Sequence, residues 1–182
     1  MAKTNWALDP THSEVAFKIR HLMISNVSGV FKNFKIDVKT EDDDFGKAKI
    51  NAVIDVNSIN TNNAQRDAHL LNSDFFETDK YPELVFNSTR IEKEDEQSYR
   101  LHGDLTIKGI TKPVTLNLEF NGIVNDPWGN ERAGFLLTGK INRSDWGISF
   151  NHLLDSGGVA LGEEIKINSE IELVKVAEAV AA

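Results

Sequence analysis

The stretch YRLHGDLTIKGITKPVTLNLEF, from Tyr99 to Phe120, alternates apolar and polar residues on both sides of a short turn that contains Gly and Pro. A period of two is typical of a β-strand with one buried and one solvated face, so the stretch predicts an antiparallel hairpin. The residues that share the apolar face are Tyr99, Leu101, Gly103, Leu105 and Ile107 before the turn, and Val114, Leu116, Leu118 and Phe120 after it.

The same alternation recurs on either side of this hairpin, at residues 14–21, 34–39, 48–56, 83–92, 132–141 and 164–173. Polar or Gly/Pro/Asn-rich turns connect several of these segments, at 41–46, 92–97 and 125–131, and their acidic runs read as solvated loop tips. Together with the hairpin, these segments give eight strand candidates. The sequence therefore predicts an all-β protein built from about eight antiparallel strands.

Small residues recur on the predicted apolar faces, where a packed β-sandwich would use larger side chains. An eight-stranded barrel is just wide enough to be filled by side chains or to hold one small ligand. We therefore favour a closed antiparallel barrel with an internal cavity over a sandwich. The small residues are Ala48, Ala52, Gly103, Ala133 and Gly139.

Residues 62–76 leave the alternation and predict a short helical segment, with capping residues at Thr61 or Asn62. Arg66 is either a structural anchor, ion-paired to a carboxylate on a neighbouring strand, or a cation at a cavity mouth that meets a polar head group. His69 is either a packing histidine or a ligand contact. Asp67 and His69 lie about 200° apart around a helix, so they cannot form a dyad or chelate one metal.

Composition bounds the remaining classes. The 182 residues fit one domain, 1–182, with residues 174–182 expected to be a flexible tail. A net charge of −8 argues against nucleic acid or an anionic membrane surface as the main partner. The chain has no cysteine, no stretch long enough for a membrane span and no apolar leader. We therefore expect a cytoplasmic protein, or a periplasmic one if the N-terminus was processed.

No catalytic or metal-binding pattern stands out. Asp9, His12 and Ser13 occur close together, but no strand–turn–helix nucleophile elbow surrounds the serine. The histidines are scattered without metal-ligand spacing, and no dinucleotide or phosphate-loop glycine pattern is present. We predict no catalytic residues, no metal and no cofactor.

Four segments resemble, in order and spacing, those of the YceI-like polyisoprenoid-binding proteins. They are LDPTHSEVAFKIRHLMISNVSGVFKNF, RDAHLLNSDFFETDKYPELVFNST, GDLTIKGITKPVTL and NRSDWGISF, and the resemblance extends from Trp6 to about Val174. It implies an elongated, lipocalin-like antiparallel barrel with a short helix near one end. It also implies a long apolar cavity that binds a polyisoprenoid or a related amphiphilic lipid. Many members resemble periplasmic proteins with a leader. The family's Asp-Phe-Gly appears here as Asp145-Trp146-Gly147, whose larger aromatic would narrow the cavity.

The predicted function is non-catalytic binding, transport or storage of a polyisoprenoid or similar long-chain lipid, such as an isoprenoid quinone, a prenyl phosphate or a fatty amide. One alternative is a small barrel enzyme, an isomerase or hydrolase, acting on an apolar substrate. Another is a filled barrel that acts in stress response or protein interaction. The oligomeric state, a homodimer included, stays open. The predicted ligand-binding residues are Val15, Phe17, Ile19, His21, Ile50, Ile54, Arg66, His69, Phe75, Phe86, Leu101, Leu105, Leu116, Leu118, Phe135 and Trp146.

Overall fold

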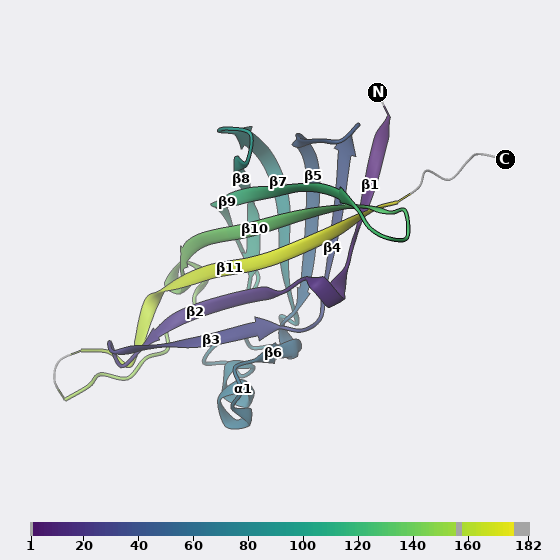
Figure 1. Ribbon diagram of the computed structural model, residues 1–182. Helices are drawn as coiled ribbons and strands as arrows, with labels where there is room; N and C mark the ends of the chain where they lie inside the picture. The colour runs from purple at the N-terminus through teal and green to yellow at the C-terminus, as the bar shows by residue number, and fades with distance from the viewer. Residues whose placement is uncertain (1, 156–157, 177–182) are drawn as a thin grey trace.

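A computed structural model describes residues 2–155 and 158–176, and its strands form one antiparallel sheet that closes into a barrel (Figure 1). The strands are β1 (Lys3–Leu8), β2 (Val15–His21), β3 (Ser25–Phe31), β4 (Phe34–Glu41), β5 (Asp44–Asp55), β6 (Ile59–Asn60), β7 (Glu83–Lys93), β8 (Ser98–Ile107), β9 (Ile110–Asn125), β10 (Glu131–Asn142) and β11 (Leu161–Val176). The helix α1 spans Ala64–Leu70, and 3-10 turns lie at Pro10–His12, Val56–Ser58 and Arg143–Trp146.

Eight strands form the closed ring, in the order β1-β4-β5-β7-β8-β9-β10-β11, and β11 pairs back to β1. The long strand β11 has two partners on its second edge. Leu173 pairs with Leu8 of β1, while Ile165 pairs with Ile19 of β2. The strands β2, β3 and β6 therefore extend the sheet beyond the ring as a flap at one end. The predicted all-β antiparallel barrel of about eight strands is confirmed.

All eight predicted strands are present, but three further strands were not predicted. The strand β1, KTNWAL, supplies the eighth member of the ring, whereas the predicted strand β2 belongs to the flap. The sequence signal of β1 is weak because Lys3, Thr4 and Asn5 make up its first half, and its large inward residues are Trp6 and the partly buried Leu8. The strand β3, SNVSGVF, is rich in small and polar residues, and β6 has only two residues.

A β-bulge fixes which side chains of β7 point inward. The pairing between β7 and β8 shifts register between Ser88 and Arg90, and a bulge of this kind moves the alternation by one residue. Leu84 and Phe86 point inward before the bulge, and Ile91 points inward after it. The bulge therefore interrupts the regular alternation that the sequence predicted for residues 83–92.

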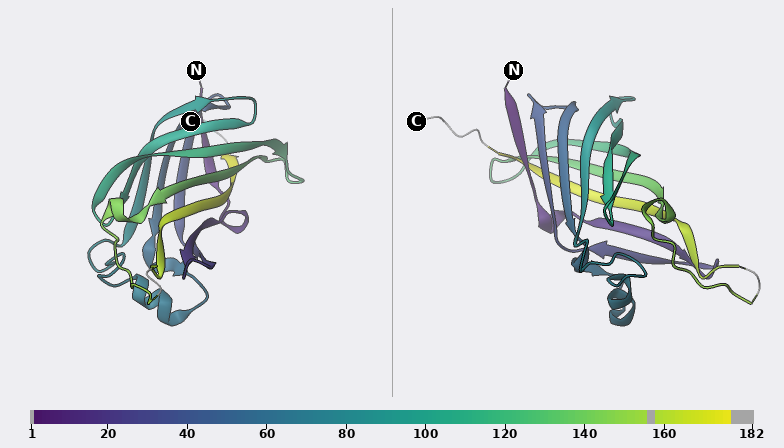
Figure 2. Two further views of the ribbon diagram at one scale, coloured as in Figure 1. Left: turned by 90° about the vertical axis from the view of Figure 1, so that its left-hand side faces the viewer. Right: turned by 180° about the vertical axis from the view of Figure 1, so that it is seen from behind.

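The predicted short helix is present as α1, and turns follow it through residues 71–76. The Asn63 side chain caps it by accepting a hydrogen bond from the backbone N–H of Arg66, so the capping role expected for Thr61 or Asn62 is wrong. Figure 2 places α1 at the end of the barrel that lies away from the N-terminus, close to the flap. The helix therefore marks one end of the barrel.

At the C-terminal end, β11 continues to Val176, and Val174 pairs with Arg132 and with Ala7. The expected flexible tail therefore cannot begin at residue 174, and the rest of it, 177–182, lies outside the described residues. The described part of the chain contains no helix long and apolar enough to cross a membrane.

Candidate functional site

An elongated cavity of about 470 Å³ occupies the barrel interior. Its wall consists of the inward faces of the barrel strands, completed by the flap, the segment that follows α1 and the 3-10 turn Arg143–Trp146. The wall is almost entirely apolar because the alternation of each strand places its apolar residues on the inner face. The cavity reaches from Phe45 and Phe135 at one end to Phe75 and Trp146 at the other.

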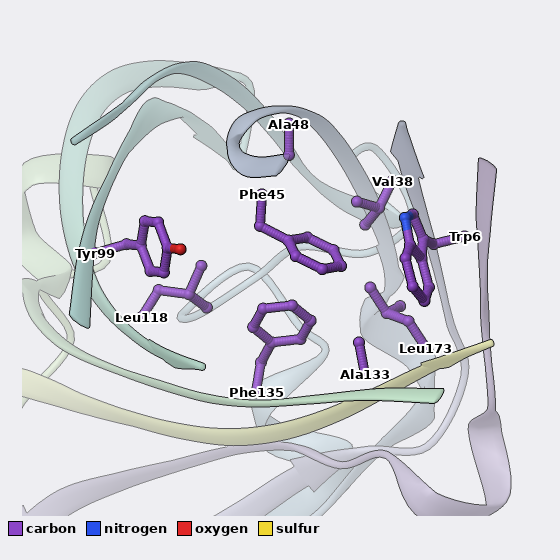
Figure 3. Packing of buried hydrophobic residues seen from close by; sticks show 9 residues of the cluster. All are labelled: Trp6, Val38, Phe45, Ala48, Tyr99, Leu118, Ala133, Phe135 and Leu173. Atoms are coloured by element: carbon purple, nitrogen blue, oxygen red, sulfur yellow. The ribbon is translucent and has the colours of Figure 1, made fainter. Parts of the chain in front are cut away.

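Aromatic side chains close the end of the barrel near the N-terminus (Figure 3). Phe45 lies at the centre, with its ring centroid 4.8 Å from that of Phe135 and 5.0 Å from that of Trp6. Trp6 is held in place because its Nε1 donates a hydrogen bond of 3.1 Å to the Thr40 hydroxyl. Phe45 is buried, so the interpretation of residues 41–46 as a purely polar, solvated turn is wrong at this position.

The middle of the barrel is not filled by side chains. Ile36, Ile50 and Leu137 belong to the inner wall, yet they remain partly exposed because they face the cavity. Around them, four better buried residues form the packed part of the wall: Ala52, Phe86, Leu101 and Leu116. An unfilled interior argues against the filled-barrel alternative.

The small inward residues contribute to this cavity in two different ways. A Cβ atom at Gly103 would lie 2.4 Å from the Phe86 ring, and one at Gly139 would lie 2.5 Å from Leu116. These glycines therefore make room for large neighbours rather than for a ligand, contrary to the expectation from sequence. Two alanines of the predicted set do line the cavity, Ala48 and Ala52. Another, Ala133, packs within the aromatic end.

Trp146 forms the wall at the opposite end of the cavity. It ends the 3-10 turn Arg143–Trp146, after which Gly147 takes a positive φ of 75° that favours glycine. The Trp146 Nε1 donates a hydrogen bond of 3.0 Å to the carbonyl of Leu105, which locks the indole against β8. Phe75 and Phe150 pack beside it, with their ring centroids 5.3 Å apart.

Polar groups gather at this same end of the cavity. The Arg66 Nε donates to the Thr61 hydroxyl at 2.7 Å, and its Nη2 donates to the Thr61 carbonyl at 2.6 Å. In the described part of the chain, Arg66 is thus anchored to Thr61 of its own segment rather than to a carboxylate on a neighbouring strand. It also lines the cavity, and its contact with a polar head group remains a prediction.

His69 lies at the rim, where its Nε2 is 2.9 Å from an Asp74 carboxylate oxygen and its ring packs edge-on against Phe75 and Phe150. Asp67 instead accepts a hydrogen bond of 2.9 Å from the backbone N–H of Thr61. Asp67 and His69 therefore have different partners, as their spacing on a helix predicts. Two further histidines line the cavity, His21 and His152.

Arg143 is a cavity-lining residue that sequence reasoning missed. Its side chain is only 4% exposed, and it bridges two chain segments by donating to the carbonyls of Gly162 at 2.9 Å and Ile148 at 3.0 Å. Burial lowers the pKa of its guanidinium, and Glu163 lies 3.6 Å away. Its position within the NRSDWGISF segment was visible, but its partner Gly162 belongs to β11, and the sequence did not predict that this residue lies beside it.

Every residue predicted to bind ligand lies on the cavity wall. Whether these residues contact a ligand remains a prediction. They are Val15, Phe17, Ile19, His21, Ile50, Ile54, Arg66, His69, Phe75, Phe86, Leu101, Leu105, Leu116, Leu118, Phe135 and Trp146.

Asp9, His12 and Ser13 do not form a nucleophilic triad. Asp9 contacts the His12 Nδ1 at 2.8 Å, but the Ser13 hydroxyl faces the backbone of Glu172, from whose N–H it accepts a hydrogen bond of 2.9 Å. The Arg132 Nη1 donates to Asp9 at 2.7 Å. Side-chain atoms of Asp9, His12 and Glu172 that could ligate a metal ion do converge. The Arg132 guanidinium, however, already supplies the positive charge that a metal ion would bring to these carboxylates. The cluster ties the 3-10 turn after β1 to β10 and β11.

Hydrogen bonds within this cluster shift several pKa values. His12 and Thr11 hold the pKa of Asp9 well below its usual range, and Arg132 lowers the pKa of Asp126 to about 2. Asp9 raises the pKa of His12 in turn. The two aspartates favour the folded state above about pH 4, and His12 favours it below about pH 6.5. The cluster therefore contributes most between these values.

We expect acid to destabilise the barrel through this cluster. As the pH falls from about 4 toward 2, the unfolded chain binds protons that folded Asp9 and Asp126 resist, so the melting temperature drops. Arg132→Gln should lower the melting temperature at pH 7 and flatten the acid-induced drop, because it removes the shared donor. Thermal unfolding of both proteins from pH 2 to 7 measures this. An equal acid-induced drop in melting temperature for both proteins would contradict the role assigned to Arg132.

Comparison with known proteins gives consistent matches. Residues 6–173 match the YceI-like domain. The chain is 41% identical over 170 residues to the UPF0312 protein SA2479 of Staphylococcus aureus. This match covers 93% of this chain and 96% of that protein. It is similar to the solved YCEI protein of Campylobacter jejuni, with a TM-score of 0.75 and 34% identity over 87% of this chain and 90% of that one.

A polyisoprenoid binding domain from Saccharophagus degradans has the same fold. Its TM-score is 0.66 at 14% identity, and the match covers 94% of this chain and 98% of that chain. At this identity, the likeness concerns the fold alone.

Proposed function

Since the chain belongs to the YceI-like family, as its four sequence segments predicted, we propose that it binds a polyisoprenoid or similar long-chain amphiphilic lipid in the barrel cavity without altering it chemically. The observation that carries the proposal is the elongated, apolar and unfilled interior of about 470 Å³. Cavities of about 300–1,000 Å³ are typical of sites for small molecules. The polyisoprenoid-binding domain with the same fold supports this ligand class.

Apolar burial sets the affinity in this proposal. A tail that buries about 400 Å² of apolar surface gains on the order of 10 kcal/mol before the cost of association. A polar contact to the head group adds only about 1–3 kcal/mol. The aliphatic wall therefore holds the tail, while the polar groups near α1 orient the head. An isoprenoid quinone, a prenyl phosphate and a fatty amide all fit this description.

The polar end of the cavity fixes the direction of the bound lipid. The aromatic cluster around Phe45 closes one end, whereas Arg66 and His69 lie at the other. The apolar tail would point toward Phe45, and the polar head would remain near Arg66. This orientation suits transport or storage, because the tail is shielded from water while the head stays accessible.

Native mass spectrometry of freshly purified protein, followed by organic extraction, tests the proposal. We expect a mass increment of one lipid per chain and an extract containing a long-chain isoprenoid or related amphiphile. A clean unliganded mass that persists after incubation with isoprenoid quinones, prenyl phosphates and fatty amides would contradict it. Conversion of the lipid during incubation would instead favour the enzyme alternative.

Arg66 provides a separate test of head-group recognition. We expect Arg66→Ala to reduce the preference for a prenyl phosphate over the matching prenyl alcohol by about three- to tenfold, since the guanidinium lies at a partly exposed rim. Affinity for the neutral alcohol should change little. Arg66→Lys, which keeps the charge, should retain part of the preference. Competition binding measures both, and an unfolded Arg66→Ala protein would leave Arg66 as an anchor only.

A further inference from the structure

The hairpin between β2 and β3 ends in an exposed apolar tip. We define the apolar tip as Leu22, Met23 and Ile24, together with Leu153 from the loop before β11. Ile24 is 81% exposed and Leu153 is 85% exposed, whereas most large apolar side chains of the described chain face inward. The backbone N–H of Leu22 donates to the carbonyl of Ala160 at 2.8 Å, which holds the two segments together.

The backbone of this tip is unfavourable for the residues that it carries. Leu22 and Met23 have φ values of 52° and 64°, and the turn is closed by a hydrogen bond from Ile24 to the His21 carbonyl. Turns with two positive φ values favour Asn-Gly. The other non-glycine residues with positive φ in the described chain are all polar, namely Asp42, Asn62, Glu77 and Lys108. The tip thus exposes large apolar side chains where polar residues or glycine would fit better.

The apolar tip adjoins the cavity. His21 precedes Leu22, His152 precedes Leu153, and Ala160 bonds to Leu22; all three of these neighbours line the cavity. Figure 1 shows β2, β3 and the loop before β11 reaching out together beyond the barrel. The apolar tip therefore lies beside the end of the cavity that these three residues line.

The charge of the hairpin differs from that of the whole chain. Residues 15–31 contain Lys18 and Arg20 but no Asp or Glu, although the chain carries a net charge of −8. Both cations are exposed on the outer face of β2. An apolar tip backed by two cations matches the layering of a phospholipid surface, where phosphates lie above the apolar region.

We propose that the apolar tip inserts into the surface of a phospholipid bilayer and brings the open end of the cavity against it. Lys18 and Arg20 then lie at the level of the phosphates, while the acidic remainder of the chain faces water. Insertion of the tip stands on its own observations, whereas passage of a lipid from the bilayer into the cavity rests on the proposed function.

A fluorescent label on the tip tests this contact directly. The chain has no cysteine, so Ile24→Cys provides a single site for an environment-sensitive dye. We expect its emission to rise and shift to shorter wavelength when phosphatidylcholine vesicles are added, and to be quenched by spin labels on the lipid chains. Glu96→Cys is the matched control, because its side chain is 94% exposed and lies in the turn between β7 and β8. A dye at this position should not respond.

A second variant separates membrane contact from folding. Leu22→Asn with Met23→Gly supplies the residues that the turn prefers, so we expect the melting temperature to rise by about 2–4 °C. The same change removes two apolar side chains, so co-flotation with vesicles should weaken about tenfold or more. Binding to vesicles that is unchanged in this stabilised variant would overturn the proposal. So would a tip signal that rises with protein concentration alone, which would indicate a second copy of the chain.

Native mass spectrometry of the wild-type protein, compared with its binding to vesicles, separates the two proposals. A wild-type protein that carries lipid but ignores vesicles would overturn the tip proposal and leave the proposed function standing. A protein that binds vesicles through its tip, but whose cavity stays empty after incubation with each lipid class, would overturn the proposed function and leave the tip proposal standing.

Discussion

Replacing Phe45 by alanine is expected to destabilise the barrel by about 3–5 kcal/mol, because it removes the ring at the centre of the closed end. Phe45 packs against Trp6, Phe120 and Phe135 with ring centroids 4.8–5.3 Å apart. Loss of the ring leaves a cavity that these neighbours can only partly fill. Chemical denaturation with urea measures the change in the free energy of unfolding.

The same variant should alter the ligand that the barrel accepts. Phe45 lines the cavity end, so its removal lengthens the space for a tail. We expect the protein to shift its preference toward longer isoprenoid chains. Phe45→Leu should retain most of the stability and the original preference. Trp128→Ala is a second control, because this aromatic residue is 78% exposed and its removal should change stability by less than about 0.5 kcal/mol. A Phe45→Ala protein as stable as the Trp128→Ala control would refute the role assigned to the closed end.

Replacing Ile50 by tryptophan should empty the cavity of lipid while leaving the barrel folded. Ile50 is a partly exposed residue of the inner wall, midway between the aromatic end and the polar end. An indole there would occupy space that the proposed tail needs. If it displaces about 100 Å² of buried ligand surface, the loss is about 2.5 kcal/mol, or about 60-fold in affinity. Lipid content by native mass spectrometry measures the effect.

The matched control is Val53→Trp, which adds the same side chain to the outer face of the same strand. Val53 lies between Lys35 and Val85 on the neighbouring strands and does not belong to the cavity wall. We expect this variant to keep its lipid. Circular dichroism and the melting temperature establish that both variants are folded. An Ile50→Trp protein that is folded and still fully loaded would place the ligand outside the cavity.

The barrel could be predicted from sequence because its strands alternate so regularly. Phe17, Leu105 and Leu116 were placed inward from period two alone, and each lies on the cavity wall. The composition of the ring was harder to predict, since it depends on which strands pair. Nothing local in β2 indicates that it pairs with the first half of β11, or that β1 pairs with the second half. Such pairings between distant segments decide which strands close the barrel.

The details of the site followed from contacts that local patterns do not encode. Phe45 is embedded in an acidic turn, and composition predicts the turn but not the direction of one aromatic side chain. Arg143 bonds to the carbonyls of Ile148 and of Gly162 in β11, which the sequence did not predict to lie beside it. Arg66 bonds to Thr61, and Asn63 caps the helix in place of Thr61 or Asn62. Long-range and irregular backbone geometry therefore set the ends of the cavity, whereas the alternation set its wall.

The divided pairing of β11 has a consequence for the order in which the molecule is made. Its edge holds both β1, which precedes the other strands in the sequence, and β2 of the flap. Until β11 has emerged, neither the ring nor the flap has its shared partner, and no enclosed interior exists. Pairings over such sequence distances form slowly. The nascent chain must therefore keep its apolar strand faces from contacting other proteins until β11 is complete. Only then can the barrel enclose a ligand.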